Sequence, residues 1–129
     1  MTTATIEMPL SPVIDTATML DRLDGDAELA CEVIGLFLED CPRRLTAVRE
    51  ALAHGDGKAL EFAAHSFKGS VSTFAAAAAT AASVRLESIG AAGDLSHAEE
   101  ACTALEHEIE RLEAALCSLV RLLSSNSHV

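Results

Sequence analysis

The sequence contains no tryptophan and no tyrosine, and only four phenylalanines among its 129 residues. Aromatic side chains are too few to dominate a core, so Leu, Ile, Val and Ala must build most of it. Strand-forming residues nowhere gather into alternating runs, whereas the helix formers Ala, Leu and Glu are abundant. This composition favours an all-α protein, and the length is that of one domain.

Positive charge is also scarce, since nine Lys and Arg face twenty Asp and Glu and leave a net charge of −11. Nucleic-acid binding needs cations that displace counterions from phosphates, so this balance argues against a nucleic-acid partner. It argues equally against anionic membrane surfaces. The only two lysines are Lys58 and Lys68, and a cation kept for a special purpose would therefore be conspicuous.

Long apolar runs and paired cysteines are missing as well. No run approaches the roughly 20 residues of a membrane span, and no secretory signal pattern opens the chain. The four cysteines are far apart and form no CxxC pair, which predicts buried free thiols in a reducing compartment (Cys31, Cys41, Cys102 and Cys117). We therefore expect a cytoplasmic protein.

The ends of the chain lack helical periodicity. Residues 1–14 are expected to form a flexible N-terminal arm, with Ile14 packed onto the body, and residues 124–129 a flexible tail. Between them, residues 15–123 are expected to form the domain. Its first element is a short helix capped by Asp15 or Thr16 and ending at Leu23.

A second, long helix is predicted from its cap Asp26 to a turn at residues 54–57. Its apolar residues step by three or four throughout (Ile34, Phe37, Cys41, Leu45, Val48 and Leu52). Pro42 lies inside this stripe and removes one backbone donor. It predicts a kink, or a restart of the helix with Asp40 as its cap.

Three further helices complete the prediction. Asp56 caps the first over about residues 57–74, and the next covers 75–89 and begins with a run of five alanines, whose small side chains permit close packing. Ser96 and Glu99 form a capping-box pattern that opens the last helix, whose stripe spans four heptads (Leu95, Ala98, Cys102, Leu105, Ile109, Leu112, Leu116, Leu119 and Leu123). The economical fold is an antiparallel four-helix bundle with a short extra N-terminal helix.

The helix over residues 57–74 has two distinct faces. On a helical wheel its large apolar residues and one alanine share a narrow wedge that must face the core (Leu60, Ala64, Phe67, Val71 and Phe74). A second set gathers on the other side (Glu61, His65, Lys68, Gly69 and Ser72). His65 is therefore predicted to face solvent, with a lysine three residues on and a glycine four residues on.

This arrangement favours phosphoryl chemistry at His65. An exposed imidazole is largely neutral at pH 7 and offers a nucleophilic nitrogen. Lys68 can neutralise part of the charge of a phosphoryl group on that nitrogen. Gly69 costs the helix about 1 kcal/mol relative to alanine. Because nothing in folding explains it on an exposed face, we interpret it as room for a partner's reactive group.

The run His65-Ser66-Phe67-Lys68-Gly69-Ser70 resembles the His-x-x-Lys-Gly-Ser/Ala signature of the histidine phosphotransfer (HPt) domains of two-component signalling. Two further patterns look like that family: Phe-Leu-x-x-x-Pro (Phe37, Leu38, Pro42) and Leu-Glu-x-x-Gly (Leu86, Glu87, Gly90). The resemblance covers about residues 15–123. One departure is Ala75, which stands where the family often has a glycine at the end of the phosphorylated helix.

The resemblance implies a carrier without turnover of its own. His65 would accept a phosphoryl group from an aspartate of a response-regulator receiver domain, or of a hybrid sensor histidine kinase, and pass it to another response regulator. Lys68 would stabilise the phosphorylated state. Mg²⁺ would belong to the partner's receiver domain, with no cofactor or metal held by this chain. Gly69, Ser72 and Phe62 would contribute to docking, and Arg43 and Arg44 could aid it.

The sequence is compatible with other interpretations. A degenerate HPt-like adaptor would bind receiver domains without phosphotransfer and would share the fold. The phosphoacceptor region of a sensor kinase is disfavoured because Ser66 follows the histidine and no proline comes later in the helix. We expect a monomer, although the last helix could extend and dimerise. The remaining histidines are expected to be solvated bystanders (His54, His97, His107 and His128).

Overall fold

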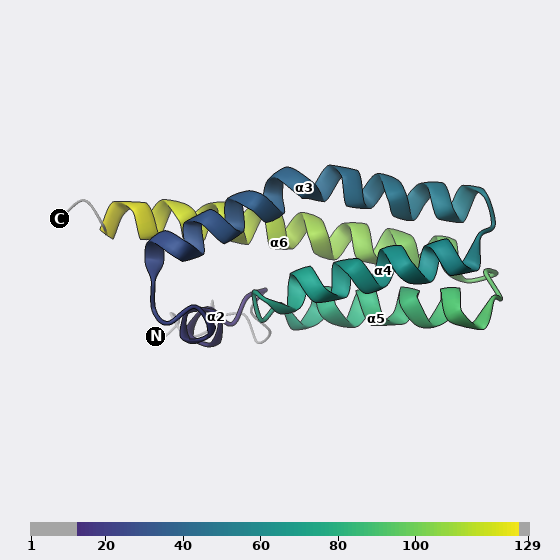
Figure 1. Cartoon of the computed structure of the whole chain (residues 1–129), viewed down its shortest axis with the longest axis horizontal. Coiled ribbons are helices and arrows are strands. Elements are labelled where there is room, and N and C mark those ends of the chain that lie inside the picture. Colours follow the sequence, from purple (N-terminus) through teal and green to yellow (C-terminus); the bar gives the residue numbers. More distant parts are fainter. Residues whose placement is uncertain (1–12, 127–129) are drawn as a thin grey trace, which may run out of the picture.

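The structure of the chain is a computed structural model that describes residues 13–126. Within that range it contains helices and no strand, which confirms the all-α prediction. The helices are α2 (Thr16–Arg22), α3 (Ala27–Ala53), α4 (Gly57–Ser72), α5 (Ala77–Ala92) and α6 (Ala98–Asn126). Figure 1 shows α3 to α6 side by side, each running opposite to the one before it, with α2 across one end of the bundle.

Three predicted helix starts are confirmed by side-chain caps. The carboxylate of Asp15 accepts a hydrogen bond from the Thr18 amide at the start of α2. Asp26 and Asp56 do the same for α3 and α4, where each accepts from an amide three residues on at 3.0 Å. Each cap satisfies one of the amides that a helix start leaves without an intrahelical partner.

The helix α3 continues unbroken through Pro42, so the predicted restart at Asp40 is wrong. The Asp40 carboxylate instead accepts hydrogen bonds from Arg43 and Arg44, the latter at 2.7 Å from Nε. Buried residues on both sides of the proline hold the helix in register, including Phe37 and Val48. Figure 1 shows the axis of α3 bending in its middle, as an interior proline requires.

The predicted boundaries of α5 and α6 need correction. The alanine run does not open α5 at residue 75, because Ala75 has a left-handed φ of 52° and the helix begins at Ala77. At its other end α5 passes through Gly90 and stops at Gly93, whose φ is 82°. The backbone carbonyl of Ala75 accepts a hydrogen bond from the Asp15 amide at 3.1 Å, which ties the turn to the start of α2.

The predicted capping box at the start of α6 is not formed. The amide of Ser96 donates to the Asp94 carboxylate at 3.1 Å, and α6 begins at Ala98, two residues after Ser96. Glu99 instead accepts a hydrogen bond from Arg49 of α3. The helix then runs to Asn126, so the predicted tail is helical up to that residue, and residues 127–129 lie outside the described range.

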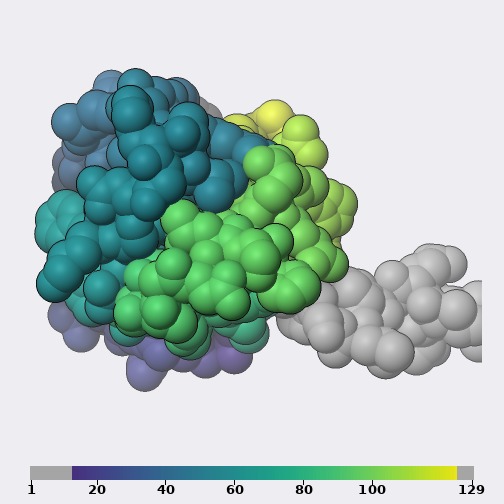
Figure 2. Space-filling view, turned by 90° about the vertical axis from the view of Figure 1, so that its right-hand side faces the viewer, coloured from purple at the N-terminus to yellow at the C-terminus, as the bar shows by residue number. Residues whose placement is uncertain are grey.

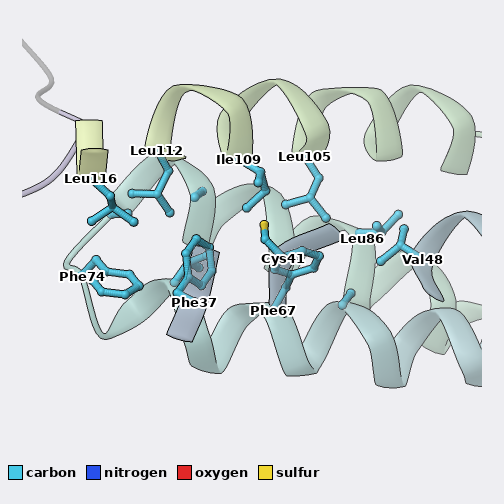
Figure 3. Packing of buried hydrophobic residues seen from close by; sticks show 14 of the residues in the cluster. Phe37, Cys41, Val48, Phe67, Phe74, Leu86, Leu105, Ile109, Leu112 and Leu116 are labelled. Carbon is cyan, nitrogen blue, oxygen red and sulfur yellow. The ribbon is translucent and has the colours of Figure 1, made fainter. Parts of the chain in front are cut away.

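The core lies between the four long helices and consists mainly of aliphatic side chains. Figure 3 shows the leucines and isoleucine of α6 above the aromatic rings of α3 and α4, with the Cys41 sulfur among them. Phe37 and Phe74 pack edge to face, with ring centroids 5.2 Å apart. The residues predicted to face the core from the helix over 57–74 are all buried, although α4 ends at Ser72 and Phe74 follows it. Ile14 before α2 is also buried. Most of the predicted arm, residues 1–12, lies outside the described range.

The cysteines only partly match the prediction of buried thiols. All four are free, and Cys41 and Cys102 are buried, but Cys31 is half-buried and Cys117 is exposed. Burial raises the pKa of the Cys41 thiol to about 12. Cys31 and Cys117 lie outside the apolar stripes of their helices. Having apolar neighbours in the sequence therefore did not predict their burial.

The pair α4 and α5 is in especially close contact. A Cβ atom added to Gly90 would lie 2.6 Å from the amide nitrogen of Glu61 and 2.7 Å from the carbonyl oxygen of Gly57. One added to Gly57 would lie 2.9 Å from the carbonyl oxygen of Gly90. Real Cβ atoms do not approach backbone atoms so closely, so this crossing requires glycine on both helices.

Candidate functional site

The outward face of α4 carries the candidate site. Leu60 and Phe67 are fully buried, and they fix the rotation of the helix about its axis. His65 lies on the opposite side and its side chain is 61% exposed, which confirms the predicted orientation. An imidazole in this position is accessible to a second protein without any opening of the bundle.

His65 is not isolated, because a carboxylate from the neighbouring helix α5 contacts it. The Nδ1 atom of His65 lies 2.8 Å from Oε2 of Glu87. The Nζ atom of Lys68 lies 3.0 Å from Oε1 of the same carboxylate. Glu87 therefore bridges the two residues that the sequence singled out, although no role was predicted for Glu87 itself. Its place in the Leu-Glu-x-x-Gly pattern was the available signal.

The Glu87 carboxylate determines which nitrogen of a neutral His65 ring carries the proton. Hydrogen bonds from Lys68 and then from His65 hold the pKa of Glu87 below its ordinary value of 4.5. Glu87 is thus ionised at neutral pH and can only accept hydrogen bonds. In neutral His65 the Nδ1 atom must then carry the proton, and Nε2 keeps its lone pair. The accessible ring nitrogen left for chemistry is Nε2.

The close crossing of α4 and α5 explains how Glu87 reaches His65. Gly90 lies one helical turn after Glu87 and packs against the α4 backbone near Glu61. The two backbones are in contact there, and the helices are antiparallel. The turn of α5 that contains Glu87, one turn before Gly90, therefore lies beside His65, which is one turn after Glu61 on α4. The glycine at the crossing therefore determines the distance between carboxylate and imidazole.

Gly69 is exposed, and a Cβ atom added there would meet no heavy atom of the domain within 4 Å. The fold itself does not require this glycine, in contrast to Gly57 and Gly90. Its lack of a side chain leaves open surface one turn beyond His65, on the face that Lys68 also borders.

Ser72 and Phe62 border the same face in different ways. The hydroxyl of Ser72 donates to the Gly69 carbonyl at 3.1 Å, and the Ser72 carbonyl accepts a hydrogen bond from Arg22 of α2. Phe62 is 76% exposed, which is unusual for a phenylalanine, and it stands between two surface hollows. One of these contains His65, and the other lies between α3 and α4.

Of the two predicted docking arginines, Arg44 is held in place by two partners. Its Nη1 donates to the Ser66 hydroxyl at 2.6 Å, and its Nε bonds Asp40, so it links α3 to the residue after His65. It lines the hollow between α3 and α4 together with Phe62. Arg43 pairs with Asp40 and projects outward.

The other described histidines lie apart from this site. The Nδ1 atom of His54 is 2.8 Å from the carbonyl oxygen of Glu50, and His97 and His107 are exposed on the surface. His128 lies outside the described residues. Within residues 13–126, no cluster of three or more His, Cys, Asp or Glu is arranged to hold a metal ion, and no helix is long and apolar enough to cross a membrane.

Comparison with known proteins identifies the family. The Hpt domain family model matches residues 32–115, so the chain belongs to the Hpt domain family, whose members carry phosphoryl groups in two-component phosphorelays. The chain is also similar to the crystal structure of histidine-containing phosphotransfer protein B (HptB) from Pseudomonas aeruginosa PAO1. The two are 24% identical with a TM-score of 0.71, over 90% of this chain and 95% of that one, which shows a shared fold. Among curated proteins no match was found.

Proposed function

We propose that this protein accepts a phosphoryl group on Nε2 of His65 from a receiver-domain aspartate and passes it to another response regulator. The observation that carries the proposal is the hydrogen bond between Nδ1 of an exposed His65 and ionised Glu87. This hydrogen bond leaves the lone pair of Nε2 directed away from the Glu87 carboxylate, on an open surface. Membership of the Hpt family supports the same reaction.

The transfer step balances without a proton donor on this chain. The Nε2 lone pair attacks phosphorus in line, a new P–N bond forms, and the P–O bond to the partner aspartate breaks. The aspartate leaves as a carboxylate. The Nδ1 proton stays on the ring, which becomes positively charged, and Glu87 stabilises that charge across 2.8 Å. The reverse sequence passes the group to the next aspartate.

Lys68 has a second partner available once the group has been transferred. In the structure its ammonium is 3.0 Å from Glu87, and its side chain is 34% exposed. Because Lys68 lies one helical turn from His65, its flexible stem allows the ammonium to move to a phosphoryl oxygen. We propose that this exchange of partners stabilises phosphorylated His65.

The remaining components would come from the partner. Gly69 leaves the surface open, while Phe62 and Ser72 border the area that a receiver domain would cover. Mg²⁺ and most of the transition-state stabilisation would be supplied by the receiver domain, whether of a response regulator or of a hybrid sensor histidine kinase. We propose that the protein acts as a cytoplasmic monomer that carries the group between such partners and has no turnover of its own.

The test is phosphate acceptance from phosphorylated receiver domains. Wild-type protein should gain phosphate that is labile in acid and stable in alkali, as a phosphorylated nitrogen is. His65→Gln should gain none while keeping its helical content and melting temperature, because the side chain is exposed. His107→Gln is the matched control, an exposed histidine on α6 that should leave labelling unchanged.

Two results would contradict the proposal. Tight receiver binding by a wild-type protein that gains no label would favour the degenerate adaptor. Labelling that persists in His65→Gln would place the acceptor elsewhere on the chain.

A further inference from the structure

The only two lysines of the chain both lie on α4 and flank His65. Lys68 follows His65 by three residues, and Lys58 precedes it by seven, which is two turns along the same face. Lys58 is exposed. It lines one surface hollow together with the reactive residue, and we name this the His65 hollow (Lys58, Glu61, Phe62, His65 and Glu87).

Lys58 differs from the other cations near the site in having no counter-charge in contact. Lys68 is paired with Glu87, and Arg44 with Asp40. Among the described residues Lys58 forms no ion pair, although Glu61 lines the same hollow and Asp56 caps the helix two residues earlier. In a chain of net charge −11, it is an exposed cation with no ion pair in the described part of the chain, and it lines the same hollow as the nucleophile.

The position of Lys58 is unfavourable for the helix itself. It is the second residue of α4, where the helix dipole presents positive charge and disfavours a cation. The first turn of α4 contains no acidic residue, although acidic residues are favoured there. Because Lys58 opposes this local preference, we attribute its presence to function and not to folding. Figure 2 looks onto the end of the bundle where α4 begins, and shows that it is open to solvent.

We propose that Lys58 attracts the anionic edge of the phosphorylated receiver domain and so raises the rate at which the two proteins meet in a productive orientation. This inference rests on the proposed function. A phosphorylated aspartate presents about two negative charges, and the carboxylates that hold the receiver's Mg²⁺ add to them. The site therefore stays negative with the metal bound, and an acidic carrier would repel it without local positive charge. Such steering acts before contact, so it affects the association rate and is weakened by salt.

The experiment compares Lys58→Glu with Arg121→Glu, a matched charge reversal. Arg121 is exposed, forms no ion pair among the described residues, and lies in the last turns of α6, at the other end of the bundle. Phosphotransfer from a phosphorylated receiver domain is measured as a second-order rate constant at about 20 mM and about 500 mM salt. Phosphoramidate, a donor too small to need a docking surface, serves as the second donor.

We expect Lys58→Glu to lower the rate constant by about tenfold at low salt, and the deficit to shrink to less than about twofold at high salt. Labelling by phosphoramidate should change less than about twofold. The melting temperature should rise by about 1 to 4 °C, because a glutamate in the first turn suits the helix dipole. A variant that is more stable and yet slower cannot be explained by damage to the fold.

Three outcomes would overturn the inference. If Lys58→Glu and Arg121→Glu slow transfer equally at low salt, the effect belongs to net charge and not to Lys58. If labelling by phosphoramidate falls as much as transfer from the receiver, Lys58 acts on His65 itself. If wild-type protein gains no phosphate from any receiver domain, the proposed function fails and this inference fails with it.

Discussion

The helix pairs α4–α5 and α3–α6 are held together in different ways. In the first pair the backbones nearly touch, and a Cβ atom on Gly90 would lie 2.6 Å from the Glu61 amide nitrogen. In the second pair large buried side chains occupy the space between the helices, among them Val48, Ile109 and Leu112 in Figure 3. One contact depends on the absence of side chains and the other on their volume.

The polar residues of the two pairs differ in a corresponding way. Between α3 and α6, both carboxylate oxygens of Glu106 accept from the Arg49 guanidinium, at 2.8 and 2.7 Å, and Glu99 accepts from its Nη1. Every charged group of this network has its partner within the network. Between α4 and α5, Glu87 is shared by Lys68 and by His65, whose second nitrogen stays available. Large side chains therefore secure this fold, while a glycine crossing positions the candidate reactive group.

The largest change in stability is expected from the α3–α6 pair. Ile109→Ala removes a fully buried side chain and leaves a cavity, so the free energy of unfolding should fall by about 2 to 5 kcal/mol. Urea unfolding at 25 °C measures this loss. Phosphotransfer by the folded variant should match wild type, since Ile109 lies on neither helix of the site. A transfer rate that falls together with stability would break the proposed separation of roles.

A substitution at the glycine crossing should affect both properties. Gly90→Ala forces α4 and α5 apart, because its Cβ would overlap backbone atoms that cannot rotate away. The free energy of unfolding should fall by about 1 to 3 kcal/mol, and phosphate acceptance should slow as Glu87 moves from His65. Gly35→Ala is the control, since its Cβ would meet nothing within 4 Å, and it should gain about 1 kcal/mol. Wild-type stability in Gly90→Ala would show that the crossing is not tight.

The features that could be predicted from the sequence are those that depend on one helix at a time. The apolar wedge of α4 determines which way His65 points, and the side-chain oxygens of Asp15, Asp26 and Asp56 are local signals for helix starts. Such signals act within a few residues, so a single sequence contains them in full.

The features that could not be predicted depend on contacts between elements. Glu87 reaches His65 only because Gly90 lets two backbones meet, and no periodicity in either helix shows that distance. The capping box predicted from Ser96 and Glu99 is not formed, and Glu99 instead accepts a hydrogen bond from Arg49 of another helix. Ala75 adopts φ of 52°, a conformation that alanine disfavours, while its carbonyl bonds Asp15 of a distant element.

Gly69 tests whether an open surface on α4 serves docking. Gly69→Ala should raise the free energy of unfolding by about 1 kcal/mol, since alanine favours the helix and its Cβ meets no atom of the domain. Transfer from a phosphorylated receiver domain should nevertheless slow by about tenfold, because the added methyl group displaces the partner from His65. Thermal unfolding and the rate of labelling measure the two effects. Unchanged transfer would mean that Gly69 lies outside the docking area.

The smallest effect concerns Glu87 and pH. Its hydrogen bonds from Lys68 and His65 hold its pKa in the folded protein below the ordinary value of 4.5. The carboxylate therefore stabilises the fold above about pH 4.5, and this contribution is lost as the pH falls through the folded-state pKa. Melting temperatures should show Glu87→Gln below wild type at pH 7, with the difference shrinking toward pH 3. Glu110→Gln, at an exposed position without an ion pair in the described part of the chain, should show no such trend. A pH-independent difference would mean that Glu87 contributes by packing and not by its charge, and the assignment of the Nδ1 proton would lose its basis.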